Sequence, residues 1–472
     1  MTVRSRFAPS PTGYLHIGSV RTALYAWLYA RRHGGTYILR IEDTDRQRST
    51  QAAVDAVLEG LKWVGIDADE GPFYQTQRFP RYAEVVQQML TAGTAYRCYC
   101  SREELDAMRA AAQAEGRKPR YDGRCRERKE PVPGVAPAIR FKNPQSGEVV
   151  VDDQVKGRIV FDNAELDDLV IARSDGTPTY NFTVVVDDMD MRITHVIRGD
   201  DHVNNTPRQI NLFRALGATP PVYAHLPMIN GADGAKLSKR HGAVNVLEYR
   251  EMGFLPVGLL NYLLRLGWSH GDQEIFSLDE MQKLFDLDHV SRSAANFDPA
   301  KLLWVNQQHL QTAPMHELAQ LLGEQLARQG LDAANGPPLT RTVAALRARS
   351  QTLREMAEQA HCYYEEFEEF DAKSAQAHLK PATRAGLIAV RQALVDLPEW
   401  SGEAAEAAVK DVAVRLSLKL GVVAQPLRVA LTGRAASPGI GDTLELVGRT
   451  RAQRRIDRAL RYIETHEAAA GG

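Results

Sequence analysis

Apolar and polar residues alternate along the first 75 residues in the pattern of an α/β protein. After Gly18, apolar side chains fall at helical spacing, at Val20, Leu24, Trp27 and Leu28. Residues 36–41 form a short, nearly continuous apolar run that is typical of a buried strand, and an acidic cluster follows it. The pattern predicts a βαβ start, with the acids at the carboxyl end of a strand, where open parallel sheets bind ligands.

The same α/β pattern returns at residues 186–240. Residues 193–197 and residues 224–229 are each predicted to form a strand. The first of these leads into Arg198, and between the two strands lies one helix face, formed by Leu212, Phe213 and Leu216. Arg198 therefore also belongs to a strand end at the predicted ligand crevice.

The intervening residues 76–185 differ in composition. They contain a charged helix over residues 103–115, a Pro/Arg-rich run up to residue 137 and short alternating strands such as residues 158–161. We expect these residues to form an α+β insertion that splits one Rossmann-like domain into residues 1–75 and 186–240.

Helical spacing dominates the rest of the chain. Residues 241–315 are predicted to form a helical connection, with leucines at positions 259, 260, 263, 264 and 266. Residues 316–472 are rich in Ala, Leu and Arg, with breaks at residues 335–338 and 433–442, and are predicted to be all-α. With 472 residues, the protein is expected to be multidomain.

Residues 6–19 contain the first candidate chemistry. Prolines at positions 9 and 11 fix a turn, Gly13 allows a ligand to approach the backbone closely, and His16 adds a titratable donor. The helix that follows directs backbone N–H groups and its dipole toward the turn, which suits phosphate. A nucleotide site is one interpretation, and a purely structural Pro/Gly turn is the other.

A second candidate lies at residues 236–242. Lys236, Lys239 and Arg240 are fixed cations, Ser238 lies among them, and a glycine-containing segment precedes them. Fixed cations suit a phosphorus centre whose negative charge grows in the transition state. An isolated basic loop is usually only solvated, but its combination with the first turn favours a nucleotide site.

Composition narrows the class of protein. Hydrophobic residues make up 44% and charged residues 25% of the chain, as in an ordinary globular protein. There is no apolar run long enough for a membrane span and no signal-peptide pattern, so we expect a cytoplasmic protein. The net charge is −1, and any affinity for RNA must therefore come from local basic patches.

Residues 16–19 (HIGS) and 236–240 (KLSKR) together resemble the HIGH and KMSKR signatures of class I aminoacyl-tRNA synthetases. Residues 6–13 and 40–45 are closer still to bacterial glutamyl-tRNA synthetases, and the resemblance spans essentially the whole chain. Two positions depart from it. Ser19 replaces the second histidine, so His16 must act with backbone groups, and a leucine replaces the methionine, which conserves volume.

The resemblance implies an ATP site that also uses Mg²⁺. His16 and Lys239 are expected to be the catalytic residues, because they can stabilise charge on the phosphates. The expected ATP-binding residues are Pro9, Ser10, Pro11, Thr12, Gly13, His16, Ile17, Gly18, Ser19, Lys236, Leu237, Ser238, Lys239 and Arg240.

The resemblance also implies a glutamate site. Glu42 is expected to hold the amino group, and Arg6, Tyr180 and Arg198 to read the rest of the amino acid, since an arginine fork binds a carboxylate bidentately. An ordinary ion pair with a nearby acid is the alternative for Arg198. Tyr180 is expected to lie in a turn over residues 177–182. The expected glutamate-binding residues are Arg6, Ala8, Ser10, Glu42, Tyr180 and Arg198.

Three of the four cysteines form a candidate zinc site. Cys98, Cys100 and Cys125 supply three soft ligands, and structural zinc requires four. Zinc-bearing relatives have a histidine two residues after the third cysteine, where this chain has Glu127. Tyr121 matches a tyrosine ligand of the shorter glutamyl-queuosine enzymes. Either residue could complete the site, and an empty site or three free thiols are the alternatives.

The resemblance assigns tRNA contacts to three regions: acceptor binding to residues 76–185, stem contact to residues 241–315 and anticodon binding to residues 316–472. Arginines crowd the last predicted helix, whose apolar face contains Ile456 and Ile463. A run of glutamates at positions 365, 366, 368 and 369 is expected to face away from RNA. The expected tRNA-binding residues are Arg349, Arg451, Arg454 and Arg455.

The expected activity is glutamate–tRNA ligation, with L-glutamate, ATP and tRNA(Glu) as partners and a monomeric enzyme. Glutamyl-queuosine modification is less favoured, because that family lacks the long helical C-terminal region. Glutaminyl-tRNA synthetase is disfavoured because its anticodon module is a β-barrel. A catalytically inactive tRNA-binding protein is the alternative from another class. The sequence leaves open whether tRNA(Gln) is also charged.

Overall fold

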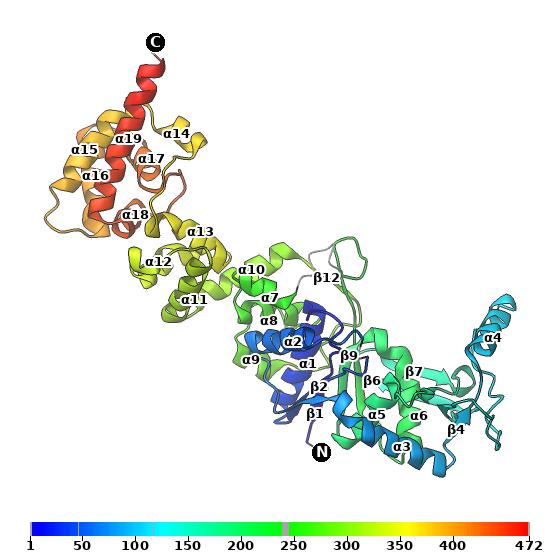
Figure 1. Cartoon of the computed structure of the whole chain (residues 1–472). Coiled ribbons are helices and arrows are strands. Elements are labelled where there is room, and N and C mark those ends of the chain that lie inside the picture. Colours follow the sequence, from blue (N-terminus) through cyan, green and yellow to red (C-terminus); the bar gives the residue numbers. More distant parts are fainter. Residues whose placement is uncertain (1, 46, 117, 238–244, 471–472) are drawn as a thin grey trace. The chain divides into compact units, whose positions relative to one another are not determined.

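The computed structural model describes residues 2–45, 47–116, 118–237 and 245–470, with side chains described through residue 467. The chain folds as two units (Figure 1). The first comprises Met1–Tyr249 and Leu259–Lys301, and the second comprises Arg250–Gly258 and Leu302–Gly472.

A parallel sheet of five strands lies in the first unit, in the order β10-β9-β1-β2-β3. Its strands are β1 (Arg4–Phe7), β2 (Thr36–Ile41), β3 (Glu70–Tyr74), β9 (His195–Gly199) and β10 (Val222–Leu226). The strand order reverses at β1, so the carboxyl ends of β1, β2 and β9 border the crevice in which doubly wound sheets bind ligands. The predicted Rossmann-like α/β fold is confirmed.

Helices of the α/β core bury apolar faces. In α1 (Ile17–Arg32), the four apolar residues that predicted the helix are all buried. The other helices of this core are α2 (Gln51–Val64), α5 (Tyr180–Asp190) and α6 (Thr206–Ala215). The turn predicted over residues 177–182 is wrong at its second half, because α5 begins at Tyr180. The apolar residues after Tyr180 are buried at helical spacing, and packing of that face favours the helix.

The insertion contains two small antiparallel sheets. The strands β4 (Ala95–Cys98), β5 (Ala138–Phe141) and β8 (Val170–Ala172) pair in the order β4-β5-β8. The strands β6 (Glu148–Asp153) and β7 (Gly157–Asp162) form a hairpin. Helices α3 (Phe79–Thr91) and α4 (Arg102–Ala114) precede and follow β4. Both the charged helix and the strand predicted at residues 158–161 are confirmed.

The segment after β10 is tied back to α1. It contains the paired strands β11 (Ile229–Asn230) and β12 (Ala295–Asn296) and the helices α7 (Val246–Glu251), α8 (Pro256–Arg265), α9 (Leu278–Leu284) and α10 (Pro299–Thr312). The guanidinium of Arg21, on α1, donates to the carbonyl of Leu266 at 2.8 Å and to the carbonyl of Pro227. Arg21 thereby fixes the position of the chain just after β10.

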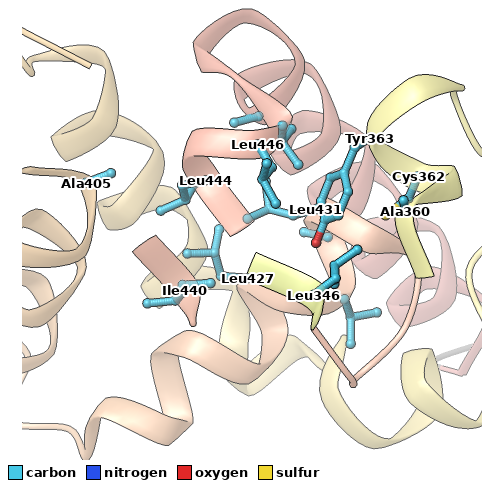
Figure 2. Close-up of a cluster of buried hydrophobic side chains, with 14 of the residues drawn as sticks. Leu346, Ala360, Cys362, Tyr363, Ala405, Leu427, Leu431, Ile440, Leu444 and Leu446 are labelled. Carbon is cyan, nitrogen blue, oxygen red and sulfur yellow. The ribbon is translucent and has the colours of Figure 1, made fainter. Parts of the chain in front are cut away.

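The second unit is helical throughout its described residues. Its helices include α11 (Met315–Arg328), α12 (Leu339–Leu346), α13 (Leu353–Tyr364), α14 (Ala372–His378), α15 (Arg384–Val395), α16 (Gly402–Arg415), α17 (Leu420–Thr432), α18 (Ile440–Val447) and α19 (Arg449–Ala470). One hydrophobic core joins them, part of which Figure 2 shows around Leu427, Leu431 and Leu444. The predicted all-α region is confirmed, and both predicted breaks separate helices.

None of the helices in the described part of the chain is both long enough and apolar enough to cross a membrane.

Candidate active site

The turn between β1 and α1 places His16 over a helix N-terminus. His16 is the N-cap of α1, and its Nδ1 accepts a hydrogen bond from the backbone N–H of Ser19 at 3.3 Å. A Cβ at Gly18 would lie 3.1 Å from the imidazole, so a side chain there would push the ring aside. The ring thus lies where free N–H groups and the helix dipole favour phosphate.

Lys236 and Asp201 both act on this histidine. Desolvation lowers the pKa of His16, the positive charge of Lys236 lowers it further, and Asp201 opposes both effects. The Nζ atom of Lys236 lies 3.8 Å from an Asp201 carboxylate oxygen. At neutral pH His16 is therefore an uncharged hydrogen-bond donor beside the positive charge of Lys236. The two candidate nucleotide-binding segments, at residues 6–19 and from residue 236, thus lie close to each other.

Backbone contacts also join residues 245 and 246 to the turn. The N–H of Val246 donates to the carbonyl of Leu15 at 2.9 Å, and Asn245 forms an antiparallel bridge with His16. Of the predicted cationic loop, the structure describes Lys236 and Leu237. The remaining residues predicted from this loop, Ser238, Lys239 and Arg240, lie outside the described residues.

The other residues of the predicted ATP set form one continuous stretch. The carbonyl of Pro9 accepts the N–H of Glu42 at 2.9 Å, which ties the turn to the end of β2. The N–H of Thr12 donates to the carbonyl of Ser10 at 2.8 Å, and among the described residues none but its own chain neighbours comes within 4 Å of the Cβ position of Gly13. The stretch from Pro9 to Ser19, which includes Pro11 and Ile17, thus runs directly into α1.

Four residues predicted to bind glutamate lie close enough to influence one another's charges, and this cluster is called the amino-acid pocket below. Arg6, Glu42 and Arg198 come from β1, the end of β2 and β9, and they are only 4%, 7% and 5% exposed. Burial and the charge of Glu42 raise the pKa of Tyr180, at the start of α5, to about 12, whereas Arg198 and Arg6 lower it. Ala8 and Ser10 flank Pro9, whose carbonyl is bonded to the backbone of Glu42.

Burial acts against the charge of two residues in this cluster, Glu42 and Arg198. Burial raises the pKa of Glu42, although Arg40 and Arg6 act in the opposite direction. Burial lowers the pKa of Arg198, and its Nη1 is buried without a hydrogen-bond partner among the described residues. Arg6 differs, because its Nε lies 3.2 Å from a carboxylate oxygen of Asp188. The pocket therefore offers one negative and one positive group to a ligand.

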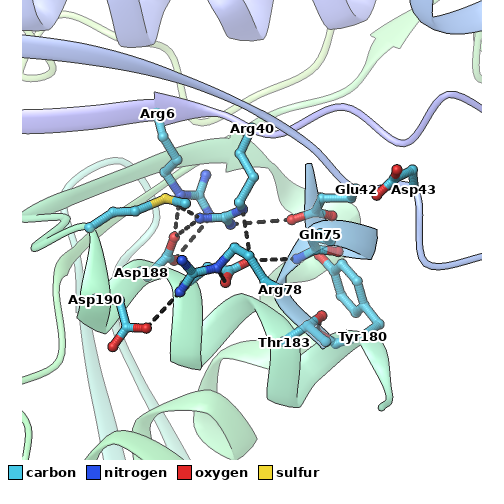
Figure 3. A network of polar contacts seen from close by, with 12 residues as sticks. Arg6, Arg40, Glu42, Asp43, Gln75, Arg78, Tyr180, Thr183, Asp188 and Asp190 are labelled. Carbon is cyan, nitrogen blue, oxygen red and sulfur yellow. Dashed lines mark hydrogen bonds and ion pairs between the residues drawn. The ribbon is translucent and has the colours of Figure 1, made fainter. Parts of the chain in front are cut away.

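A fully buried arginine, Arg40, connects residues of this cluster through ion pairs (Figure 3). It donates to Asp188 at 2.7 Å and to Glu42 at 3.2 Å, and its Nε lies 3.5 Å from Asp187. Asp188 also bonds Arg6, so a single carboxylate connects Arg6 to Arg40. The pair Arg40–Asp188 thereby fixes both Arg6 and Glu42.

The sequence analysis assigned no role to Arg40, Asp187 or Asp188. A signal for them exists, because an arginine inside an apolar strand needs a buried counter-charge. The two adjacent aspartates follow the apolar run of residues 184–186, and they are 0% and 2% exposed. His202 was also left without a role, yet its Nδ1 lies 3.1 Å from the hydroxyl of Tyr180.

The cysteines form a cluster in the insertion. One sulfur atom from each of Cys98, Cys100 and Cys125 lies within 4.8 Å of the others. The hydroxyl of Tyr121 lies 3.4 Å from the sulfur of Cys98 and 3.6 Å from that of Cys100. Three thiols and a phenol oxygen therefore surround one point, which fits a four-ligand site.

Glu127 does not join this cluster. Its carboxylate lies 2.9 Å from the Nζ of Lys142, and its side chain is 82% exposed. The hydrogen bond and charge of Lys142 lower the pKa of Glu127. Of the two fourth ligands expected from the sequence, the structure places Tyr121 at the sulfurs and directs Glu127 elsewhere.

In the second unit, Arg349 lines a cavity of about 200 Å³. Its guanidinium donates to the carbonyl of Ser437 at 2.5 Å, and Arg428 bonds the same carbonyl at 3.0 Å. Tyr363, Arg434 and Thr432 are other lining residues. An aromatic ring, arginines and hydroxyl groups are the kinds of group that bind an unstacked nucleotide base.

The arginines of α19 differ in how far they are exposed to solvent, and so in whether they can contact RNA. Arg455 is 1% exposed, and it donates to Glu366 and to the carbonyls of Leu431 and Cys362. The interpretation of Arg455 as an RNA contact therefore does not fit the structure. Arg451 and Arg454 also pair with Glu366, but the Arg454 side chain is 63% exposed. One acid of the run predicted to face away from RNA, Glu366, therefore lies against the arginines of α19.

A doubly wound parallel sheet, a histidine-capped first helix and a lysine loop beside it define a class I aminoacyl-tRNA synthetase catalytic domain. In agreement, the family model "tRNA synthetases class I (E and Q), catalytic domain" matches residues 2–304. The model "Anticodon binding domain" matches residues 317–460.

Curated relatives narrow the family. A protein of Alkalilimnicola ehrlichii named "Glutamate--tRNA ligase 1" is 59% identical over 467 residues, covering 99% of each chain. One of the same name from Nitrosococcus oceani is 57% identical, covering 98% of this chain and 99% of that one. A solved glutamate tRNA ligase from Elizabethkingia meningosepticum, in complex with its amino acid, has a TM-score of 0.87 at 32% identity and covers 98% of this chain and 100% of its own. The chain belongs to the glutamate–tRNA ligase family.

Proposed function

We propose that the protein joins L-glutamate to tRNA(Glu) in two steps. First, the α-carboxylate of glutamate attacks the α-phosphorus of ATP, which forms glutamyl-adenylate and releases pyrophosphate. Then a hydroxyl of the 3′-terminal adenosine of the tRNA attacks the activated carbonyl carbon, which releases AMP. No side chain acts as a nucleophile, so the residues bind, orient and stabilise charge.

The charges of Glu42 and Arg198 in the pocket carry this proposal. Glu42 is a buried carboxylate whose pKa stays raised although Arg40 and Arg6 act against the rise, and the α-ammonium group of an amino acid would add positive charge beside it. Arg198 is a buried guanidinium with a free Nη1, and a carboxylate supplies its counter-charge. A zwitterion with an extra carboxylate satisfies both, and L-glutamate is such a ligand.

The phosphates of ATP fit the turn that precedes α1. His16 donates as a neutral imidazole, the free N–H groups of α1 face the same region, and Lys236 adds positive charge. We assign Lys239 the same kind of role from the sequence. Mg²⁺ accompanies ATP and neutralises phosphate charge when bound.

The roles of His16 and Lys239 are tested by presteady-state rates of adenylate formation. We expect His16→Ala and Lys239→Ala to slow adenylate formation by at least about a hundredfold, as the loss of a charge-stabilising group does. Glutamate binding should change little, because neither residue belongs to the set expected to bind glutamate. Equal losses in rate and in glutamate affinity would reject both roles.

We further propose that the cysteine cluster binds one structural Zn²⁺ through Cys98, Cys100, Tyr121 and Cys125. The sulfur and phenol oxygen distances support this ligand set, and the Lys142 pair of Glu127 argues against the alternative set. The metal would brace β4 against the loop that carries Tyr121. In metal analysis of the purified protein, Tyr121→Phe should lower the zinc content, and Glu127→Gln should not.

For the tRNA, we propose that the cavity beside Arg349 receives a base of the anticodon loop, and that Arg451 and Arg454 contact the backbone. The anticodon-binding family model over this unit supports the first assignment. We do not assign Arg455, whose guanidinium is buried and bonded. Acceptor and stem contacts stay assigned to residues 76–185 and 241–315, and the protein is proposed to act as a cytoplasmic monomer.

The test is charging of purified tRNA(Glu) and tRNA(Gln) with labelled glutamate and labelled glutamine, with and without ATP. ATP-dependent attachment of glutamate to tRNA(Glu) alone supports the proposal and identifies a discriminating enzyme. Glutamate on both tRNAs identifies a non-discriminating one. Glutamate attached only within a queuosine nucleoside, or tRNA binding with no charging, would contradict the proposal.

A further inference from the structure

The pocket arginine Arg198 is held by residues that lie behind it. In the β9–β10 register, Arg198 lies directly beside His225. The Nε of Arg198 donates to the Nε2 of His225 at 3.2 Å, and its Nη2 donates to the hydroxyl of Thr206 at 2.9 Å. Only Nη1 is left without a partner among the described residues. Two of the three guanidinium nitrogens are therefore fixed by hydrogen bonds, and Nη1 is available to a ligand.

This arrangement requires one protonation state of His225. Burial lowers the pKa of His225 below its ordinary value, and although Asp153 raises it, the guanidinium of Arg198 lowers it further. The imidazole is therefore neutral at pH 7, with one donor and one acceptor nitrogen. Since Nε2 must accept from Arg198, the proton is on Nδ1, which lies 2.6 Å from a carboxylate oxygen of Asp153.

Asp153 is itself immobilised. It is the last residue of β6, in the insertion, and its side chain is fully buried. Its carboxylate accepts the backbone N–H groups of His225, Val155 and Lys156 at 2.7 to 3.2 Å. Burial would raise its pKa, but these hydrogen bonds and that of the His225 ring lower it. An ionised carboxylate thus selects the tautomer of His225.

We infer that His225, oriented by Asp153, is a positioning residue that aims the free Nη1 of Arg198 and thereby sets the selectivity for a carboxylate-bearing substrate. The inference rests on the proposed glutamate-binding role of Arg198. It also connects the insertion, through Asp153, to the amino-acid pocket. In this inference only Arg198 contacts the substrate, and Asp153 and His225 act through it.

A purely structural role makes different predictions. If the three residues only satisfy one another in the interior, loss of His225 lowers stability and affects all substrates alike. If His225 aims Arg198, loss of its acceptor weakens glutamate selection and leaves ATP binding unchanged. Measuring KM for glutamate and KM for ATP separately distinguishes the two.

The test uses the full-length protein in aminoacylation of tRNA(Glu), with thermal unfolding as a fold control. His225→Leu removes the acceptor and should raise KM for glutamate roughly tenfold or more, the effect of one hydrogen bond to a charged group, with KM for ATP unchanged. His225→Gln, which keeps an acceptor oxygen, should retain much of the wild-type KM. The matched control is His195→Leu, at a histidine on the neighbouring strand whose ring packs at a tilt against Tyr29, and it should change neither constant.

Asp153→Asn provides a second route if His225→Leu does not fold. Its amide can donate to Nδ1 of His225, which moves the ring proton to Nε2, opposite the N–H of Arg198. Glutamate KM should then rise although no volume changes. An unchanged glutamate KM in both variants, or an equal rise in the KM for ATP, would overturn the inference.

Arg198→Ala separates this inference from the proposed function. In an Arg198→Ala background, glutamate binding by calorimetry should already be weak, and adding His225→Leu should weaken it no further. If Arg198→Ala alone leaves glutamate binding intact, the role of Arg198 is wrong. If Arg198→Ala weakens binding and His225→Leu adds its full effect on top, His225 does not act through Arg198.

Discussion

Two groups of arginines in this protein are used in opposite ways. In the amino-acid pocket, Arg40 is fully buried and lies against Asp187, Asp188 and Glu42. On α19, Arg451, Arg454 and Arg455 share one acid, Glu366. The buried arginine is surrounded by acids that fix its position, and the arginines of α19 carry an excess of positive charge that remains partly exposed.

The difference matches what each region must recognise. A small zwitterion is selected by a few groups whose positions are fixed to within a fraction of an ångström, and a buried network of ion pairs provides that precision. An RNA backbone is a line of similar charges, for which excess positive charge matters more than exact placement. Removing residues from each group therefore tests the comparison.

Arg40→Met should have the largest effect. It removes one of the two arginines that pair with each of the buried acids Asp187 and Asp188, and breaking such a network costs about 3–5 kcal/mol. It also releases Glu42 and, through Asp188, Arg6, so charging activity should be lost. Urea unfolding of the first unit and aminoacylation measure the two effects.

The control is Arg48→Met, which breaks an ion pair with Asp45 whose side chains are 73% and 39% exposed. Exposed pairs contribute about 0–1 kcal/mol, so this variant should remain near wild type. Similar losses of stability and activity in both variants would mean that the buried ion pairs of Arg40 contribute no more than an exposed pair.

This network also marks where sequence analysis stopped. The strand at residues 36–41, helix α1 and the placement of Glu42 at a strand end followed from apolar periodicity. The aspartate partners of Arg40 did not, because they lie on α5, a helix whose start was interpreted as a turn, and Asp188 is 148 positions from Arg40. Periodicity gives the face of an element, and it does not give the element that packs against that face.

Arg455 shows a different kind of error. The arginines of the last helix were treated as one basic surface, yet Arg455 lies three residues after Ala452 and four before Ala459, both of which are fully buried. Those intervals place Arg455 on the buried stripe of the helix. Correct phasing could have identified it from the sequence, but its partner Glu366, on another segment, could not be identified.

Glu366→Gln should have the next largest effect. It keeps an acceptor oxygen but removes the negative charge that faces the buried Arg455, and it should destabilise the second unit by about 1 kcal/mol, a modest figure because the carboxylate is partly exposed. Hydrogen exchange of peptides from α13 and α19 measures this local loss.

The pH dependence of that effect has a definite sign. Burial would raise the pKa of Glu366, but Arg455 and Arg454 hold it below its ordinary value. A carboxylate with a depressed pKa contributes stability above its unfolded pKa of about 4.3, and the contribution disappears as the pH falls through the folded value. The difference between wild type and Glu366→Gln should be full at pH 7 and should vanish at acidic pH. A difference that persisted there would show that the charge is not responsible.

Arg349→Ala should affect RNA recognition and spare stability. Arg349 is exposed on one side and donates to Ser437 at the cavity, so its loss should raise KM for tRNA(Glu) roughly tenfold, as loss of one base contact does. The glutamate and ATP constants should not change. Arg347→Ala, in the same segment, is the control and should raise KM for tRNA much less.

Arg454→Ala should have the smallest effect, and it sharpens the comparison most. Its side chain is 63% exposed, and its described partner is Glu366, which keeps the bond to Arg455 when Arg454 is removed. We therefore expect no measurable change in hydrogen exchange and a weakening of tRNA binding by less than about threefold at physiological salt, growing at low salt, because one phosphate contact contributes through counterion release. A binding loss as large as that of Arg349→Ala, or one independent of salt, would place Arg454 among the fixed and specific arginines, and the division between the two groups would fail.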